Sequence, residues 1–150
     1  MNISDILIKK FKDYNCQSIV KNEISTFEII NPFWEENITV ITEGEELIFS
    51  FSYQHAHFSN DVDSIFKYIS NFLEAKQVVV EFFMNDNKIF GGDRSINELD
   101  KSTGDTILKS FFNNDEIYAQ YKNCLQGQRC CCKIRCWNNK YNEDIDFILN

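Results

Sequence analysis

The sequence predicts an α+β fold: a largely antiparallel sheet with helices packed on one face. Three observations lead to this prediction. Apolar and polar residues alternate in several short runs, as they do in strands that are buried on one side. Short turns separate these runs, which favours hairpins and therefore antiparallel pairing. One longer segment, residues 61–74, instead repeats its apolar residues with helical spacing.

Composition and charge limit the class of protein. The chain has 150 residues, 43% of them hydrophobic, with one proline and five glycines. These values are typical of a globular protein, and the length predicts a single domain that spans residues 1–150. The formal net charge is −8. Because lysine and arginine bind the phosphates of nucleic acids, this charge argues against a nucleic-acid partner and favours a basic protein partner, although an acidic surface can also serve solubility alone.

The start of the chain predicts the compartment. MNISDILIKKFKDY lacks the basic and then apolar organisation of a secretion signal. No run approaches the roughly 18 apolar residues that cross a membrane. We therefore expect a cytoplasmic protein that is not bound to a membrane, and we expect its six cysteines to be reduced thiols.

In the first half of the chain we expect two helices, a short strand and a hairpin. Apolar spacing predicts helices at 3–14 and 61–74, the second with Phe66 at the centre of its apolar face. Residues 26–30 read as a short strand. A further strand at 38–42 and one beginning at residue 46 flank a turn in which Gly44 can take a positive φ.

That last strand is expected to continue through both histidines of the chain, His55 and His57, and to keep them on its core-facing side. Residues two apart on a strand point the same way, so two imidazoles so placed can bind one metal ion. A third ligand would have to come from Asp61, Asp63 or Glu81. The alternative is a polar rim where the strand meets solvent. We predict this alternative, with no bound metal and no other cofactor.

The second half of the chain is expected to be mostly strand. The predicted order is strands at 76–84 and 88–90, a loop at 93–106, a strand at 107–112, a helix at 115–125, and strands at 128–137 and 141–149. Alternation places Cys130, Cys132 and Cys136 on the core side, where they act as small hydrophobic residues rather than zinc ligands. Cys131 should face outward and be the more reactive thiol.

Two tryptophans are candidates for an exposed binding surface. Trp34 precedes two glutamates in a loop, and Trp137 lies at a strand end. Exposed tryptophan beside carboxylates suits a basic protein partner, whereas the alternative is that each tryptophan covers an edge of the core. On the first interpretation, the predicted binding residues are His55, His57, Trp34, Glu35, Glu36 and Trp137.

Two segments resemble a type of small bacterial cytosolic protein. In ELIFSFSYQHAHFSNDVDSIFKYISNFLEAKQVVVEFFMNDNKIFGG, a strand ending in H-x-H-[FY] precedes a helix, and a strand, a turn and a strand ending in small residues follow. KIRCWNNKYNEDIDF is similar to the C-terminal hairpin of these proteins but has Asn139 where glycine is usual and Asn142 where an acid is usual. The resemblance covers about half of the chain. Some of these proteins are encoded beside polymorphic toxins and are regarded as immunity proteins.

The resemblance implies a non-catalytic protein that binds and masks a toxin. The residues agree with this, because the sequence has no G-x-S-x-G nucleophile motif and no phosphate-binding glycine loop. The favoured hypothesis is therefore an immunity-like protein for a basic partner. The alternative is a small metal-dependent enzyme that uses His55 and His57.

Overall fold

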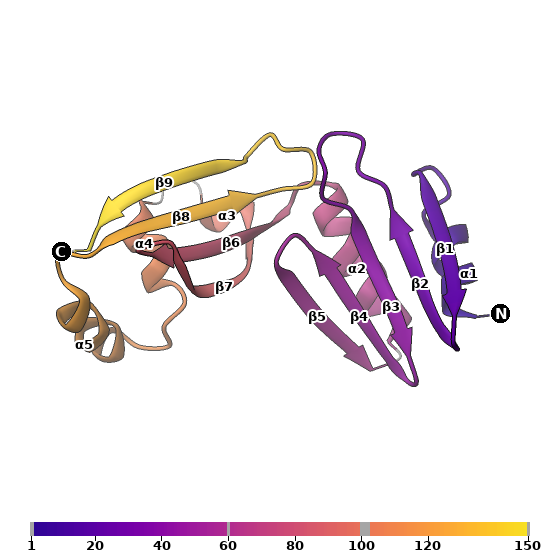
Figure 1. The fold of residues 1–150 in the computed structure, drawn as a ribbon, viewed down its shortest axis with the longest axis horizontal. Coiled ribbons are helices and arrows are strands. Elements are labelled where there is room, and N and C mark those ends of the chain that lie inside the picture. The colour runs from indigo at the N-terminus through magenta and orange to yellow at the C-terminus, as the bar shows by residue number, and fades with distance from the viewer. Residues whose placement is uncertain (1, 60, 100–102, 150) are drawn as a thin grey trace.

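The chain has an α+β fold with two antiparallel sheets, in a computed structural model that describes residues 2–59, 61–99 and 103–149 (Figure 1). The first sheet has five strands in the order β1-β2-β3-β4-β5, and the second has four in the order β7-β6-β8-β9. In the first half the elements are α1 (Ile3–Lys10), β1 (Cys16–Lys21), β2 (Ile24–Ile29), β3 (Ile38–Glu43), β4 (Glu46–Phe51), β5 (Gln54–Ser59) and α2 (Val62–Leu73). In the second half they are β6 (Gln77–Met84), β7 (Asn87–Ser95), α3 (Ile96–Leu99), α4 (Gly104–Lys109), α5 (Asp115–Leu125), β8 (Arg129–Arg135) and β9 (Glu143–Ile148).

A hairpin between β4 and β5 replaces the single long strand predicted from residue 46 to residue 57. Ser52 has a φ of 53°, and Phe51 pairs with Gln54 across the turn. Residues directly opposite each other point to the same face, so the even-numbered residues of β5 face the core with Phe51. His55 and His57 therefore point away from the core, and their predicted core-facing orientation is wrong. A turn without glycine or proline left no clear signal in the sequence.

Two helices cover one face of the five-stranded sheet. α2 was predicted from its spacing and is confirmed, with Asp61 as its N-cap and Ile65, Ile69 and Phe72 fully buried. α1 packs against β1 and β2 on the same side through Leu7. Figure 1 shows α2 behind the sheet. Phe66 is only partly buried, so it does not have the central place that the periodicity indicated.

The second half departs from the prediction between residues 91 and 112, where β7 runs on to Ser95 and where α3 and α4 form in place of part of the predicted loop and of the predicted strand. The predicted strand at 107–112 is wrong, because residues 104–109 form α4 with Thr103 as its cap. A short apolar run of this kind is ambiguous between helix and strand, and the cap decides it here. The predicted loop 93–106 includes residues 100–102, which lie outside the described residues. β7 continues past Gly91 and Gly92 to Ser95 instead of ending there.

The helices of the second half cover one face of the four-stranded sheet. Cys130, Cys132 and Cys136 are buried on this side, as the alternation predicted. Burial, the largest cause, raises the pKa of the Cys132 thiol to about 12. These thiols are therefore packing groups. Among the described residues, no helix combines the length and the apolar character needed to cross a membrane.

Candidate functional site

One face of the five-stranded sheet has no helix packed on it within the described part of the chain. We name it the open sheet face and define it by two rows of residues that lie opposite one another across the five strands. The first row is Ile19, Thr26, Ile41, Ile48 and His57. The second row is Gln17, Glu28, Thr39, Ser50 and His55. In Figure 1 this face is opposite to α2.

The first row of the open sheet face contains three isoleucines, of which Ile41 and Ile48 are partly exposed. Ile41 and Ile48 occupy neighbouring positions on its central strands, and neither packs on either hydrophobic core. Ile19, at the edge, is 58% exposed. The water-facing side of an antiparallel sheet normally carries polar residues, and contiguous exposed apolar residues mark interaction surfaces. This row of isoleucines is therefore a candidate binding surface.

Both histidines lie on the open sheet face and are exposed. The Nδ1 atom of His55 is 3.1 Å from the hydroxyl of Ser50 on the adjacent strand. The Nδ1 atom of His57 is 2.5 Å from a carboxylate oxygen of Glu46. Each imidazole is thus held by a side chain of β4, and both point away from the core. Their role in binding stays a prediction.

The topology gathers carboxylates at one end of this sheet. The β1–β2 turn, the β3–β4 turn and the start of α2 all lie at the end where β3 finishes and β5 finishes. We name this region the acidic end and define it as Glu23, Glu43, Glu45, Glu46, Asp61 and Asp63. The acidic end could not be predicted from the sequence, because its residues are separated along the chain by up to 40 positions.

The acidic end is part of a larger imbalance of charge. Residues 16–59, which form the five strands, contain seven glutamates and one lysine, so they contribute −6 of the chain's net charge of −8. Within the described residues, no lysine or arginine forms an ion pair with any of the seven. Glu43 lies directly opposite Glu46, an arrangement that destabilises a sheet. Glu46 contacts His57 and Glu28 accepts a hydrogen bond from Gln17, but none of the seven carboxylates is neutralised by a lysine or arginine of the described chain.

The candidate metal ligands do not meet. Glu81 lies on β6 in the other sheet, where its side chain is buried and 3.4 Å from the ammonium of Lys88. Asp61 caps α2, and its hydrogen bonds to the side chain and the backbone of Ser64 lower the pKa of its carboxyl group. Over the described ranges there is no group of three or more histidine, cysteine, aspartate or glutamate residues placed to hold a metal ion.

The two tryptophans join the sheets instead of forming an exposed surface. Trp137 is 2% exposed, and its ring lies 6.0 Å from that of Phe51. Trp34 is half-buried, and its Nε1 donates to the carbonyl oxygens of Cys136 and Trp137, each at 3.0 Å. The prediction of exposure is wrong for Trp137, and both residues cover the core edge, as the alternative interpretation held. The physical reason is that the β2–β3 loop packs against the β8–β9 turn (Figure 1).

Asn31 fixes that loop. Its Nδ2 donates to the carbonyl oxygen of Glu36 at 2.8 Å and to that of Trp137 at 2.9 Å, and the residue is 8% exposed. Glu35 is exposed and Glu36 is half-buried in the same loop, which lies at the end of the sheet away from the acidic end. The structure therefore separates Glu35 and Glu36 from the acidic end of the same sheet.

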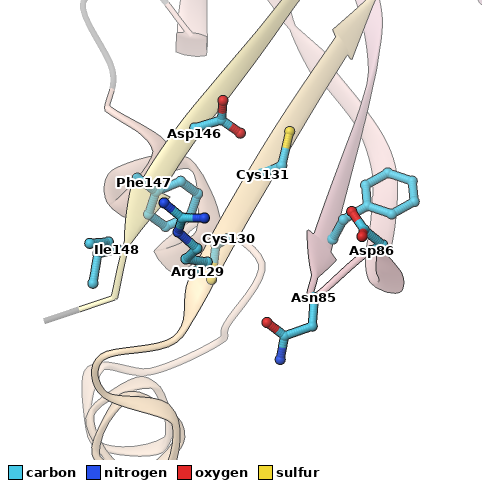
Figure 2. Close-up of a pocket in the computed structure, with 9 residues that line it drawn as sticks. Asn85, Asp86, Arg129, Cys130, Cys131, Asp146, Phe147 and Ile148 are labelled. Atoms are coloured by element: carbon cyan, nitrogen blue, oxygen red, sulfur yellow. The ribbon is translucent and has the colours of Figure 1, made fainter.

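A surface hollow of about 590 Å³ lies on the four-stranded sheet, beside the β6–β7 turn (Figure 2). Figure 2 shows Cys131 and Asp146 on its neighbouring strands β8 and β9. Burial, and then the hydrogen bond and negative charge of Asp146, raise the pKa of the Cys131 thiol. Cys131 lies on the face of the four-stranded sheet that is away from the buried Cys130 and Cys132, as predicted. It is not activated as a nucleophile, because the raised pKa disfavours the thiolate and both histidines are on the other sheet.

Comparisons of the chain with models of known families, with curated proteins and with solved structures found no match.

Proposed function

We propose that this protein is a non-catalytic binding protein whose open sheet face and acidic end bind a basic protein partner, in the manner of an immunity protein that masks a toxin. The observation that carries the proposal is a set of glutamates, none of them ion-paired with lysine or arginine among the described residues, around a sheet face that no described helix covers and that carries Ile41 and Ile48. The resemblance of the sequence to immunity-type proteins supports the same direction.

The two parts of the surface have different physical tasks. Burying Ile41 and Ile48 removes apolar area from water and stabilises the complex. The carboxylates attract lysine and arginine, speed the encounter and fix the orientation of the partner. A cation placed between Glu43 and Glu46 would also relieve the repulsion of two like charges on opposite positions. A basic protein therefore fits this surface better than a neutral or acidic one.

The first test is recovery of a partner and measurement of its association. Tagged protein expressed in the source cell should capture a basic protein at low salt, and the product of any toxin gene beside this one is the first to examine. The purified pair should associate more slowly in 0.5 M salt, where the Debye length is about 4 Å. Association that is unaffected by salt would contradict the electrostatic part of the proposal.

The second test locates the surface. Glu43→Gln with Glu46→Gln should slow association by about tenfold or more, which is the lower end of the range for electrostatic steering. Glu116→Gln with Glu143→Gln removes the same charge from exposed positions of the second half and should leave the rate nearly unchanged. Equal effects of the two double variants would show that the acidic end is not the contact.

The enzyme alternative has a separate test. We predict that purified protein carries no stoichiometric metal, because Glu46 lies beside His57 but the described residues contain no group of three or more histidine, cysteine, aspartate or glutamate side chains placed to hold a metal ion. Metal analysis after dialysis measures this. One equivalent of zinc or iron that His55→Ala with His57→Ala removes would favour the enzyme.

A further inference from the structure

β1 is an unpaired edge strand with apolar side chains exposed on both of its faces. Ile19 is 58% exposed and Val20 is 65% exposed, and they point to opposite sides of the sheet. Tyr14, just before the strand, and Ile24, just after it, are also exposed. An edge strand offers a row of free backbone donors and acceptors, so exposed apolar residues there favour pairing with another strand.

The β1–β2 hairpin determines which backbone groups are free. Asn22 and Glu23 form a two-residue turn with positive φ at both positions, and Lys21 pairs with Ile24 across it. At the other end, the N–H of Ile30 donates to the carbonyl oxygen of Asn15 at 2.9 Å. Hydrogen-bonded pairs alternate along an antiparallel ladder, so the odd-numbered residues of β1 bond to β2. The N–H and C=O groups of Cys16, Ser18 and Val20 therefore point outward.

The other three sheet edges differ from β1 in charge, register or contacts. β9 carries Glu143, Asp144 and Asp146, whose charges would repel a copy of the same strand. β7 has an irregular register beside Phe82, and it contacts β5, the remaining edge strand. β1 has a regular register and a single charged residue, Lys21, and unlike β5 it exposes two large apolar side chains, Ile19 and Val20.

We propose that β1 pairs with β1 of a second copy of this chain, antiparallel about a two-fold axis at Ser18. In this register Ser18 of one copy lies opposite Ser18 of the other, and Cys16 of each copy lies opposite Val20 of the other. The outward-pointing backbone N–H and C=O groups of these six residues then form hydrogen bonds between the two strands. Gln17 faces Ile19, and Lys21 faces Asn15, so no two like charges lie opposite each other along β1. An isologous contact of this kind closes on itself as a dimer.

The surrounding structure accommodates the pairing. Strands are about 4.8 Å apart, and α1 packs on both β1 and β2, so the two α1 helices would lie about 10 Å apart, a normal packing distance. The two sheets would become one ten-stranded sheet with both open sheet faces on the same side. This inference does not depend on the proposed function, because the dimer forms without a partner.

Sedimentation equilibrium of the full chain, from micromolar to millimolar concentration, tests the dimer. Val20→Lys places a charge on the edge at an exposed position and should raise the dissociation constant about tenfold or more, since two symmetric sites are affected. Ile148→Lys makes the same change at a residue of β9 that is 55% exposed, and it should leave the dissociation constant of the dimer unchanged. A monomer throughout the range, or equal effects of both variants, would overturn the proposal.

A cross-link tests the register independently of affinity. Residues in a hydrogen-bonded antiparallel pair have Cα atoms about 5.5 Å apart, which is within disulfide range. In a Cys124→Ser background, which removes the exposed native thiol, Ser18→Cys should form a disulfide-linked dimer under mild oxidation. Ile148→Cys in the same background is the control. A cross-link no faster at position 18 than at position 148 would reject the register.

Discussion

Glu81 is the residue whose environment is least expected from the sequence. Its side chain is 1% exposed, and neither carboxylate oxygen accepts a hydrogen bond within the described chain. Burial is the largest influence and raises its pKa, while Lys88, Lys133 and Arg135 oppose that rise. Gly91 makes the one ion pair possible, because a Cβ atom there would lie 3.0 Å from the Lys88 side chain. The ionised form of Glu81 is therefore costly to bury.

We expect Glu81→Gln to stabilise the fold at pH 7, by about 1 kcal/mol, since a buried carboxylate that the partly exposed Lys88 compensates only in part becomes a neutral group of the same shape. The folded-state pKa lies above the unfolded value, so the contribution of Glu81 to stability is greatest below the unfolded pKa and is lost as pH rises through the folded pKa. The advantage of the variant should thus shrink as pH falls toward about 4.5. Urea unfolding at several pH values measures the difference in the free energy of unfolding between the variant and the unaltered protein.

Lys88→Met is the opposite change and should destabilise the protein at pH 7 by about 1–2 kcal/mol, because Glu81 loses its nearest cation. The loss is smaller than for a fully buried pair, since the Lys88 side chain is 42% exposed. Acidification should reduce this loss as well. If both variants shifted stability in the same direction, the account of Glu81 as a costly buried carboxylate would be wrong.

At the scale of elements, hairpin turns decide which face a strand presents. The β4–β5 turn depends on Ser52 in a left-handed conformation, which costs a non-glycine residue about 1 kcal/mol. That single turn moves both histidines from the core side to the open sheet face. The loss in local conformational energy is compensated by the packing of β5 on α2 through Ala56 and Phe58.

Ser52→Gly should therefore raise the free energy of unfolding by up to about 1 kcal/mol, because glycine adopts a positive φ without strain. Thermal or urea unfolding measures this. Ser59→Gly, in the same strand pair but without a positive φ, is the control and should be neutral or destabilising. A destabilised Ser52→Gly protein would argue against this hairpin.

The helix α2 gives a second prediction at this scale. Phe72 is fully buried and stacks on Phe49 with ring centres 5.2 Å apart, so Phe72→Ala should cost about 3–5 kcal/mol. Phe66 is partly buried beneath Lys10, so Phe66→Ala should cost clearly less. The order of the two losses in urea unfolding is the test. A larger loss at Phe66 would mean that α2 presents a different face.

At the scale of the whole molecule, two cores meet at Trp137. This residue comes from the turn after β8 but belongs to the core of the five-stranded sheet, together with Val79 of β6. Asn31 and Trp34 bond to the same backbone segment from the other half. Buried contacts of Trp137, Val79 and Asn31 therefore join the two sheets.

Trp137→Ala should destabilise the protein by about 3–5 kcal/mol, as truncation of a buried tryptophan does. Far-UV circular dichroism during urea unfolding measures the loss. Trp34→Phe keeps the ring contact with Phe51 but removes the Nε1 donor, and it should cost only about 1 kcal/mol. Equal losses would show that the hydrogen bonds of Trp34 matter as much as the packing of Trp137.

The sequence by itself determined the α+β class, the helix at 61–74, most strands, the buried cysteines and the excess of negative charge. These features depend on periodicity and composition, which are local properties. Tertiary structure alone decided the orientation of His55 and His57, the burial of Trp137 and the gathering of the acidic end. Each of these depends on a turn without a strong signal or on contact between distant segments, and neither is encoded in the spacing of neighbouring residues.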